Sequence, residues 1–164
     1  MDSHDEQGTV IDQEAYTVRR TIHISASIDK VWAAITEPEL ISQWFTQSTV
    51  LDGTGVGASG FFTFSPTTSI PIRIEEIDRP NMIAYRWSND DAEAQKVGRR
   101  PETVDDARSL LMKFTLEPTP DGVRLNLVET GFATTLDPKY NMEAHVRGWN
   151  QFLDQLITFC RADA

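Results

Sequence analysis

Residues 137–160, DPKYNMEAHVRGWNQFLDQLITFC, decide the fold that we predict for this chain. Asp137 followed by Pro138 is typical of a helix start, because Asp caps free amide groups and Pro is tolerated in the first turn. Apolar side chains then recur at helical spacing on one stripe: Met142, Val146, Trp149, Leu153, Leu156 and Cys160. The pattern predicts one amphipathic helix of roughly 20 to 25 residues, long enough to cross a whole sheet.

Gly148 stands inside this helix, directly before Trp149. A glycine there weakens a helix by roughly 1 kcal/mol relative to alanine. We therefore expect that something approaches the helix backbone closely at Gly148.

The chain before this helix changes its period several times. Residues 16–25 alternate as a strand, and residues 27–35 and 36–45 have the spacing of two short helices. Five more segments then alternate as strands: 61–64, 69–78, 82–87, 110–117 and 123–129. This order predicts an α+β fold, in which a strongly curved antiparallel β-sheet wraps around the long C-terminal helix.

Composition limits the class of protein. The chain has 164 residues, a length that fits one domain. Its formal net charge of −10 would repel nucleic acid. No apolar run approaches the roughly 20 residues of a membrane span. Residues 1–14 are acidic and lack the features of a secretory signal, so we expect a disordered tail, a single domain over 15–162 and a cytoplasmic protein.

Residues 88–108, SNDDAEAQKVGRRPETVDDAR, form the one long internal stretch without clear periodicity. The segment is too long for an ordinary hairpin and too polar for a core. It is either a surface excursion with few buried contacts or a mobile lid.

Few residues in the sequence indicate chemistry. The three histidines lack metal-ligand spacing and Cys160 is the only cysteine, so we predict neither a metal site nor a cofactor. No catalytic motif is present. Glu129 continues the inward phase of residues 123–127, where it would hydrogen-bond a ligand or act as a general base; alternatively it ends the strand at the solvent. His145, one helical turn before Trp149, is a second polar candidate that could equally be exposed.

Several segments together resemble one superfamily. SASIDKVWAAITEPELISQWF (25–45) is similar to the opening of the SRPBCC superfamily, which includes START lipid-transfer domains, the birch-pollen allergen fold and aromatic polyketide cyclases. The group it most resembles is the heat-shock-protein-90 ATPase activator-like family. Further similar segments are the Gly-rich turn before FFTF, IEEIDRPNMIAYRW (74–87), TLEPTPDGVRLNLVETGF (115–132) and HVRGWNQFLDQL (145–156). The resemblance covers residues 16–160.

This resemblance implies a helix-grip fold with an elongated, mostly apolar cavity between the sheet and the C-terminal helix. Trp149 would then form a wall of the cavity, or it would be packed core. The side chains expected to contact a ligand are Trp44, Phe62, Phe64, Ile72, Ile74, Ile83, Tyr85, Trp87, Met112, Phe114, Glu129, His145, Trp149, Phe152 and Leu153.

Three functions follow from this fold. The leading hypothesis is a module that binds a small hydrophobic or aromatic molecule. The alternatives are a cyclase-like or hydrolase-like enzyme that uses Glu129 or His145 in the same cavity, and a co-chaperone of a heat-shock-protein-90-like ATPase, as the family name implies. The ligand and the oligomeric state stay open.

Overall fold

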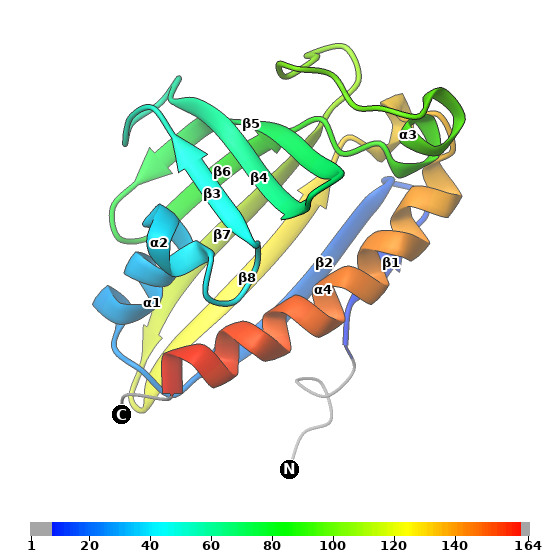
Figure 1. Cartoon of the computed structure of the whole chain (residues 1–164). Coiled ribbons are helices and arrows are strands. Elements are labelled where there is room, and N and C mark those ends of the chain that lie inside the picture. The colour runs from blue at the N-terminus through cyan, green and yellow to red at the C-terminus, as the bar shows by residue number, and fades with distance from the viewer. Residues whose placement is uncertain (1–7, 162–164) are drawn as a thin grey trace.

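The structure, a computed structural model, describes residues 8–161 (Figure 1). It contains the predicted strands and helices in the predicted order, together with further short elements at Val10–Asp12, Ser48–Leu51 and Asp91–Val97. The elements are β1 (Val10–Asp12), β2 (Thr17–Ile24), α1 (Ile28–Thr36), α2 (Pro38–Ile41), β3 (Ser48–Leu51), β4 (Ser59–Ser65), β5 (Thr68–Asp78), β6 (Met82–Trp87), α3 (Asp91–Val97), β7 (Leu110–Thr119), β8 (Gly122–Thr130), the 3₁₀ turn η2 (Phe132–Thr134) and α4 (Pro138–Arg161).

All eight strands belong to one antiparallel sheet, in the order β1-β2-β8-β7-β6-β5-β4-β3. The sheet curves, and α4 lies across its concave face (Figure 1). The α+β helix-grip fold predicted from the sequence is therefore confirmed.

Helix α4 begins as its sequence predicts. The amide of Tyr140 donates to the Asp137 carboxylate at 3.1 Å, and Pro138 is the first helical residue. The helix runs for 24 residues, within the predicted range. Among residues 8–161, no helix is both long enough and apolar enough to cross a membrane.

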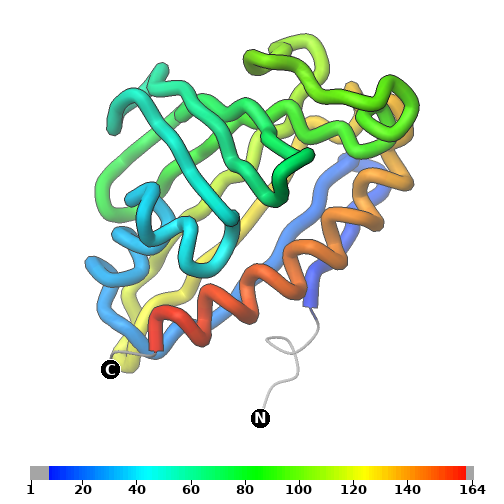
Figure 2. The backbone as a smooth tube through the Cα atoms, in the orientation of Figure 1, coloured from blue at the N-terminus to red at the C-terminus, as the bar shows by residue number. Residues whose placement is uncertain are grey.

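Different elements cover the two ends of α4. Helices α1 and α2 lie near its C-terminal end, whereas α3 and the loop that follows it lie near its N-terminal end (Figures 1 and 2). The Ser27 hydroxyl caps α1 by accepting a hydrogen bond from the Lys30 amide at 3.2 Å, as its position in the sequence predicts.

The core lies between α4 and the concave face of the sheet. Strand β8 shows why: residues 123, 125, 127 and 129 point inward and are buried, while the alternate residues are more exposed. The largest fully buried side chains include Tyr85, Phe62, Phe114, Phe132, Ile72, Ile83, Leu110 and Met112. Burying one large apolar side chain contributes roughly 1.5–3 kcal/mol to stability.

Part of the expected acidic tail is ordered. Val10–Asp12 form β1, which pairs antiparallel with β2 from Val10 opposite Arg19 to Asp12 opposite Thr17. The Thr9 amide also donates to the side chain of Asn150 on α4 at 2.9 Å. The predicted disorder is thus wrong for these residues, because backbone pairing does not require an apolar sequence; residues 1–7 lie outside the described part of the chain.

The polar segment 88–108 is not a plain surface loop. It contains α3, and Ser88, Asn89 and Asp90 are buried. Asp90 accepts hydrogen bonds from the Glu93 amide, from Asn141 on α4 at 2.9 Å and from the Leu136 amide at 2.8 Å. Polar contacts therefore dock the segment on α4, where apolar periodicity alone indicated few buried contacts.

Candidate functional site

Glu129 is the polar residue at the centre of the site. It is the last of the inward-facing residues of β8 and has 0% of its surface exposed. The alternative that it ends the strand at the solvent is wrong. A carboxylate in such a place needs strong hydrogen-bond partners, since burying an unpaired charge is very costly.

Three side chains from two elements supply those partners. The indole Nε1 of Trp87 on β6 donates to Oε2 at 2.8 Å, and the indole Nε1 of Trp149 on α4 donates to Oε1 at 2.8 Å. His145 Nδ1 lies 2.8 Å from Oε1. An ionised carboxylate only accepts, so His145 must donate through Nδ1. The opposite ring atom, Nε2, therefore faces away from Glu129.

His145 is held as a cation. Burial by itself lowers the pKa of the imidazole, but the facing carboxylates of Glu129 and Asp91 outweigh burial and raise this pKa to about 10. Nε2 lies 3.5 Å from Oδ2 of Asp91, an ion-pair distance without hydrogen-bond geometry. Among the described residues, this buried Nε2 has no hydrogen-bond partner.

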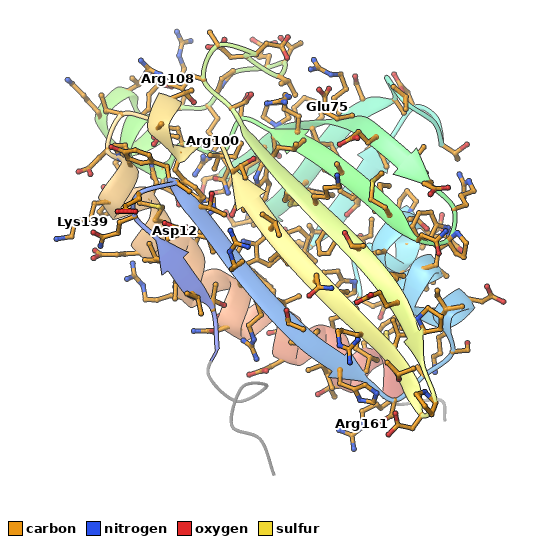
Figure 3. All side chains as sticks on the ribbon, turned by 180° about the vertical axis from the view of Figure 1, so that it is seen from behind. Asp12, Glu75, Arg100, Arg108, Lys139 and Arg161 are labelled. Carbon is orange, nitrogen blue, oxygen red and sulfur yellow. The ribbon has the colours of Figure 1, made fainter. Side chains whose placement is uncertain are left out.

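Asp91, the first residue of α3, extends the charge network. Arg100 Nη2 donates to Asp91 Oδ1 at 2.8 Å, and Arg100 Nη1 donates to Asn89 at 2.9 Å. Burial raises the pKa of the Asp91 carboxyl, but His145 and Arg100 outweigh it and hold the pKa below its usual value. Figure 3 shows Arg100 near the end of the molecule where Lys139 marks the start of α4. Glu129, His145, Asp91 and Arg100 thus alternate in charge, and their formal charges cancel.

A pocket of about 200 Å³ opens beside this network. It is lined by Phe45, Phe64, Thr68, Ile70, Trp87, Asn89, Asp91, Arg100, Ala144, His145, Gly148, Trp149 and Phe152. Thr68, Asp91 and Arg100 also line a wider groove of about 730 Å³ between α3, the loop after it and the β4–β5 turn. Since the pocket and the groove share these three residues, the groove lies directly beside the pocket, next to segment 88–108.

The sequence indicated that another element approaches the helix backbone closely at Gly148, but none of the described elements does. A Cβ atom added there would meet only the ring of Phe152, at 3.8 Å, which is ordinary van der Waals contact. Gly148 lines the pocket instead. The missing side chain leaves space for a ligand, whereas we expected it to leave space for a neighbouring element.

The structure brings five of the expected ligand contacts together in this pocket: Phe64, Trp87, His145, Trp149 and Phe152. Glu129 lies behind them, joined to three of them by the contacts above. The core holds Trp44, Phe62, Ile72, Tyr85, Met112, Phe114 and Leu153, none of which lines this pocket. Ile74 and Ile83 border a different pocket of about 390 Å³ near the end of α1.

Trp149 combines the two roles that the sequence left open. Its ring stacks on Phe45 with centroids 5.3 Å apart and meets Phe114 edge-on at 6.0 Å. It is 2% exposed, yet it lines the pocket. Trp149 is therefore packed on one side and forms a wall on the other.

The sequence did not identify Phe45, Asn89, Asp91 and Arg100 as site residues. Phe45 was predicted on the apolar face of a short helix, but nothing there indicated its contact with Trp149. The other three lie in segment 88–108, for which no structure was predicted. Among residues 8–161, no group of three or more His, Cys, Asp and Glu side chains is placed to hold a metal ion.

Comparison with known proteins supports the fold. The chain superimposes on protein MLL2253 of Mesorhizobium loti with a TM-score of 0.73 and 23% identity, covering 90% of this chain and 98% of that one. It matches the Aha1 dimer structure from Colwellia psychrerythraea with a TM-score of 0.66 and 16% identity, covering 88% and 95% of the two chains. For CalU16 from Micromonospora echinospora the TM-score is 0.63 and the identity 22%, with coverage of 90% and 76%.

Sequence comparison identifies the family. No curated protein matches the chain. The family model described as "Activator of Hsp90 ATPase homolog 1-like protein" matches residues 25–160, which is most of the chain and includes every element from α1 to α4. The chain therefore belongs to the Activator of Hsp90 ATPase homolog 1-like family.

Proposed function

We propose that this protein binds a small hydrophobic or aromatic molecule in the pocket beside His145. The observation that carries the proposal is the pocket wall. Five aromatic side chains, those of Phe45, Phe64, Trp87, Trp149 and Phe152, line a single space. Such a surface offers a flat molecule both apolar area and ring stacking.

The pocket has room for one or two rings, and the groove beside it has room for a further ring. An engineered apolar cavity of about 150 Å³ in another protein holds benzene. The pocket here measures about 200 Å³ and borders the wider groove, so a second ring or a substituent can extend outward. Its polar residues, His145, Asp91 and Arg100, lie together, which would orient the ligand.

The two alternatives have less support. General base catalysis by Glu129 requires a free carboxylate oxygen near the substrate, but Glu129 accepts from three donors and does not line the pocket. The co-chaperone alternative rests on the description of the family, and a chaperone pull-down would test it directly.

A neutral fluorescent probe tests the proposal. N-phenyl-1-naphthylamine should bind the wild-type protein and gain fluorescence, because the pocket shields it from water. Gly148→Leu fills the pocket and should abolish this signal. Arg147→Leu adds the same side chain one residue away on the exposed face of α4 and should leave it unchanged. Equal binding by both variants would contradict the proposal.

A further inference from the structure

We propose that the pocket selects a neutral aromatic molecule with a hydroxyl group, which is held between His145 Nε2 and Asp91 Oδ2. This inference rests on the proposed function and adds the chemical class of its ligand. It follows from the two ends of the imidazole ring, from the carboxylate that faces it, and from the charges around the pocket.

The first step concerns the donor. Glu129 fixes one end of the ring, because its carboxylate takes the proton of His145 Nδ1. The other end, Nε2, belongs to a side chain that lines the pocket and is 5% exposed, and it has no hydrogen-bond partner among the described residues. The ion pair with Asp91 does not have hydrogen-bond geometry, so a ligand oxygen that accepts from Nε2 would supply the hydrogen bond that this buried donor lacks.

The second step concerns the acceptor. Asp91 uses Oδ1 to bind Arg100, and its Oδ2 faces His145 Nε2 at 3.5 Å. We place the oxygen atom of the ligand in contact with both of these atoms. A hydroxyl group accepts and donates at once, so it can accept from Nε2 and donate to Oδ2. A ketone or ether oxygen satisfies only the first of these contacts.

The third step concerns charge. The carboxylates of Glu129 and Asp91 are already balanced by His145 and Arg100, and the whole chain carries a formal charge of −10. A ligand carboxylate would add a third negative charge beside Asp91 in a buried site, where like charges repel strongly. A neutral hydroxyl avoids this repulsion.

Four matched probes test the inference by isothermal titration at pH 7: naphthalene, 2-methoxynaphthalene, 2-naphthol and 2-naphthoate. They share one ring system and differ in the polar group. We expect 2-naphthol to bind about tenfold more tightly than naphthalene, since hydrogen bonds to charged groups are the stronger ones. The methoxy compound, which cannot donate, should fall between them, and 2-naphthoate should bind most weakly.

The His145→Asn variant tests whether Nε2 of His145 causes the preference for 2-naphthol. The shorter amide can replace Nδ1–H as a donor to Glu129 but cannot reach the position of Nε2. In this variant 2-naphthol and naphthalene should bind with similar affinity, so the preference for 2-naphthol is lost. If circular dichroism shows that the variant is unfolded, the order of the four binding affinities on the wild-type protein tests the inference by itself.

The outcomes separate the two proposals. If naphthalene and 2-naphthol bind equally, or if 2-naphthoate binds best, the hydroxyl inference fails while hydrophobic binding stands. A folded His145→Asn variant that keeps the preference for 2-naphthol also overturns it. If none of the four probes binds, the proposed function fails and the inference fails with it.

Discussion

His145 Nδ1 lies 2.8 Å from Oε1 of Glu129, so an ion pair joins the middle of α4 to the end of β8 inside the core. Both side chains are buried. Such a pair contributes little net stability when it is compared with apolar residues of the same size, but removing one partner strands the other charge. The pair therefore links α4 to the sheet and leaves Nε2 of His145 on the side away from Glu129.

Replacing Glu129 with Gln should destabilise the protein strongly. The neutral amide cannot compensate the charge of His145, and its NH₂ group competes with the indole donors of Trp87 and Trp149. Breaking a buried ion pair costs roughly 3–5 kcal/mol, which urea unfolding would measure as a lower free energy of unfolding. The pKa of His145 should fall in the same variant, as seen by NMR titration.

Glu117→Gln provides the control for this change. Glu117 lies on β7 and pairs with Arg124 at 3.6 Å, where both side chains are more than half exposed. Exposed pairs contribute about 0–1 kcal/mol, so this variant should be nearly as stable as the wild type. A similar loss of unfolding free energy in the two variants would show that the buried pair stabilises the protein no more than an exposed pair does.

The stability of the protein should fall as the pH rises from about 6.5 towards 10. The folded pKa of His145 is raised to about 10 from an ordinary value of 6.5, so its contribution is complete below pH 6.5 and is lost as the pH approaches 10. Between these limits the folded state binds one more proton than the unfolded state. The free energy of unfolding should therefore decrease by about 1.4 kcal/mol per pH unit.

Urea unfolding between pH 6.5 and 8.5 gives the clearest measurement of this slope. Above pH 9 Cys160 also contributes, because burial raises the pKa of its thiol from 9.0 to about 11. Asp91 contributes only at low pH, since its pKa lies below the ordinary value of 3.8. The slope should be largely absent in His145→Asn, and an unchanged slope there would assign it to another group.

The fold could be predicted because it depends on patterns that repeat along the chain. The alternation of β8 gave Glu129 the inward phase and left its burial open, and the apolar stripe of α4 placed Trp149 against the sheet. These predictions required only the periods of strands and helices. The partners of Glu129 could not be predicted in the same way, because they depend on the pairing of distant elements.

Helix α3 in segment 88–108 was not predicted from the sequence, for a physical reason. The helix has no buried residue, so a search for apolar periodicity could not find it. Its end signals were nevertheless readable: Asp90 caps the helix through the Glu93 amide, and Gly98 adopts a left-handed conformation with φ of 87° at its C-terminus. Even so, those signals do not predict that Asp91 would meet His145.

Gly148→Ala should make the protein more stable and the pocket smaller. Alanine favours a helix by roughly 1 kcal/mol over glycine, and the new methyl group meets only the Phe152 ring at 3.8 Å. We expect the melting temperature to rise by roughly 2–4 °C. Binding of N-phenyl-1-naphthylamine should weaken, whereas Arg147→Ala on the exposed face should change neither quantity. A loss of stability in Gly148→Ala would mean that the helix backbone does need glycine at this position.

Asp90→Ala should release α3 from α4. The substitution removes the helix cap and the contacts to Asn141 and Leu136. In the wild type the amides of Ala94 and Gly98 are hydrogen-bonded within α3 and should be protected from hydrogen exchange. Loss of a cap costs roughly 0.5–2 kcal/mol, so their protection should fall by about tenfold.

Glu102→Ala provides the control: it lies at an exposed position in the same segment and should leave the protection of both amides unchanged. Fast exchange of both amides in the wild type would restore the interpretation of this segment as a mobile loop.

Trp149→Phe should show what the indole N–H contributes to holding Glu129. The substitution keeps most of the ring that packs on Phe45, but it removes one donor from a buried carboxylate. Hydrogen bonds to charged groups contribute roughly 1.5–3 kcal/mol, and neutral ones roughly 0.5–1.5 kcal/mol.

Trp44→Phe provides the control, because there the indole donates to a neutral carbonyl, that of Ala34, at 2.8 Å. Chemical unfolding should therefore give a clearly larger loss for Trp149→Phe than for Trp44→Phe. If the two losses are equal, the carboxylate does not depend on Trp149, and the contacts with His145 and Trp87 suffice to hold Glu129 in the core.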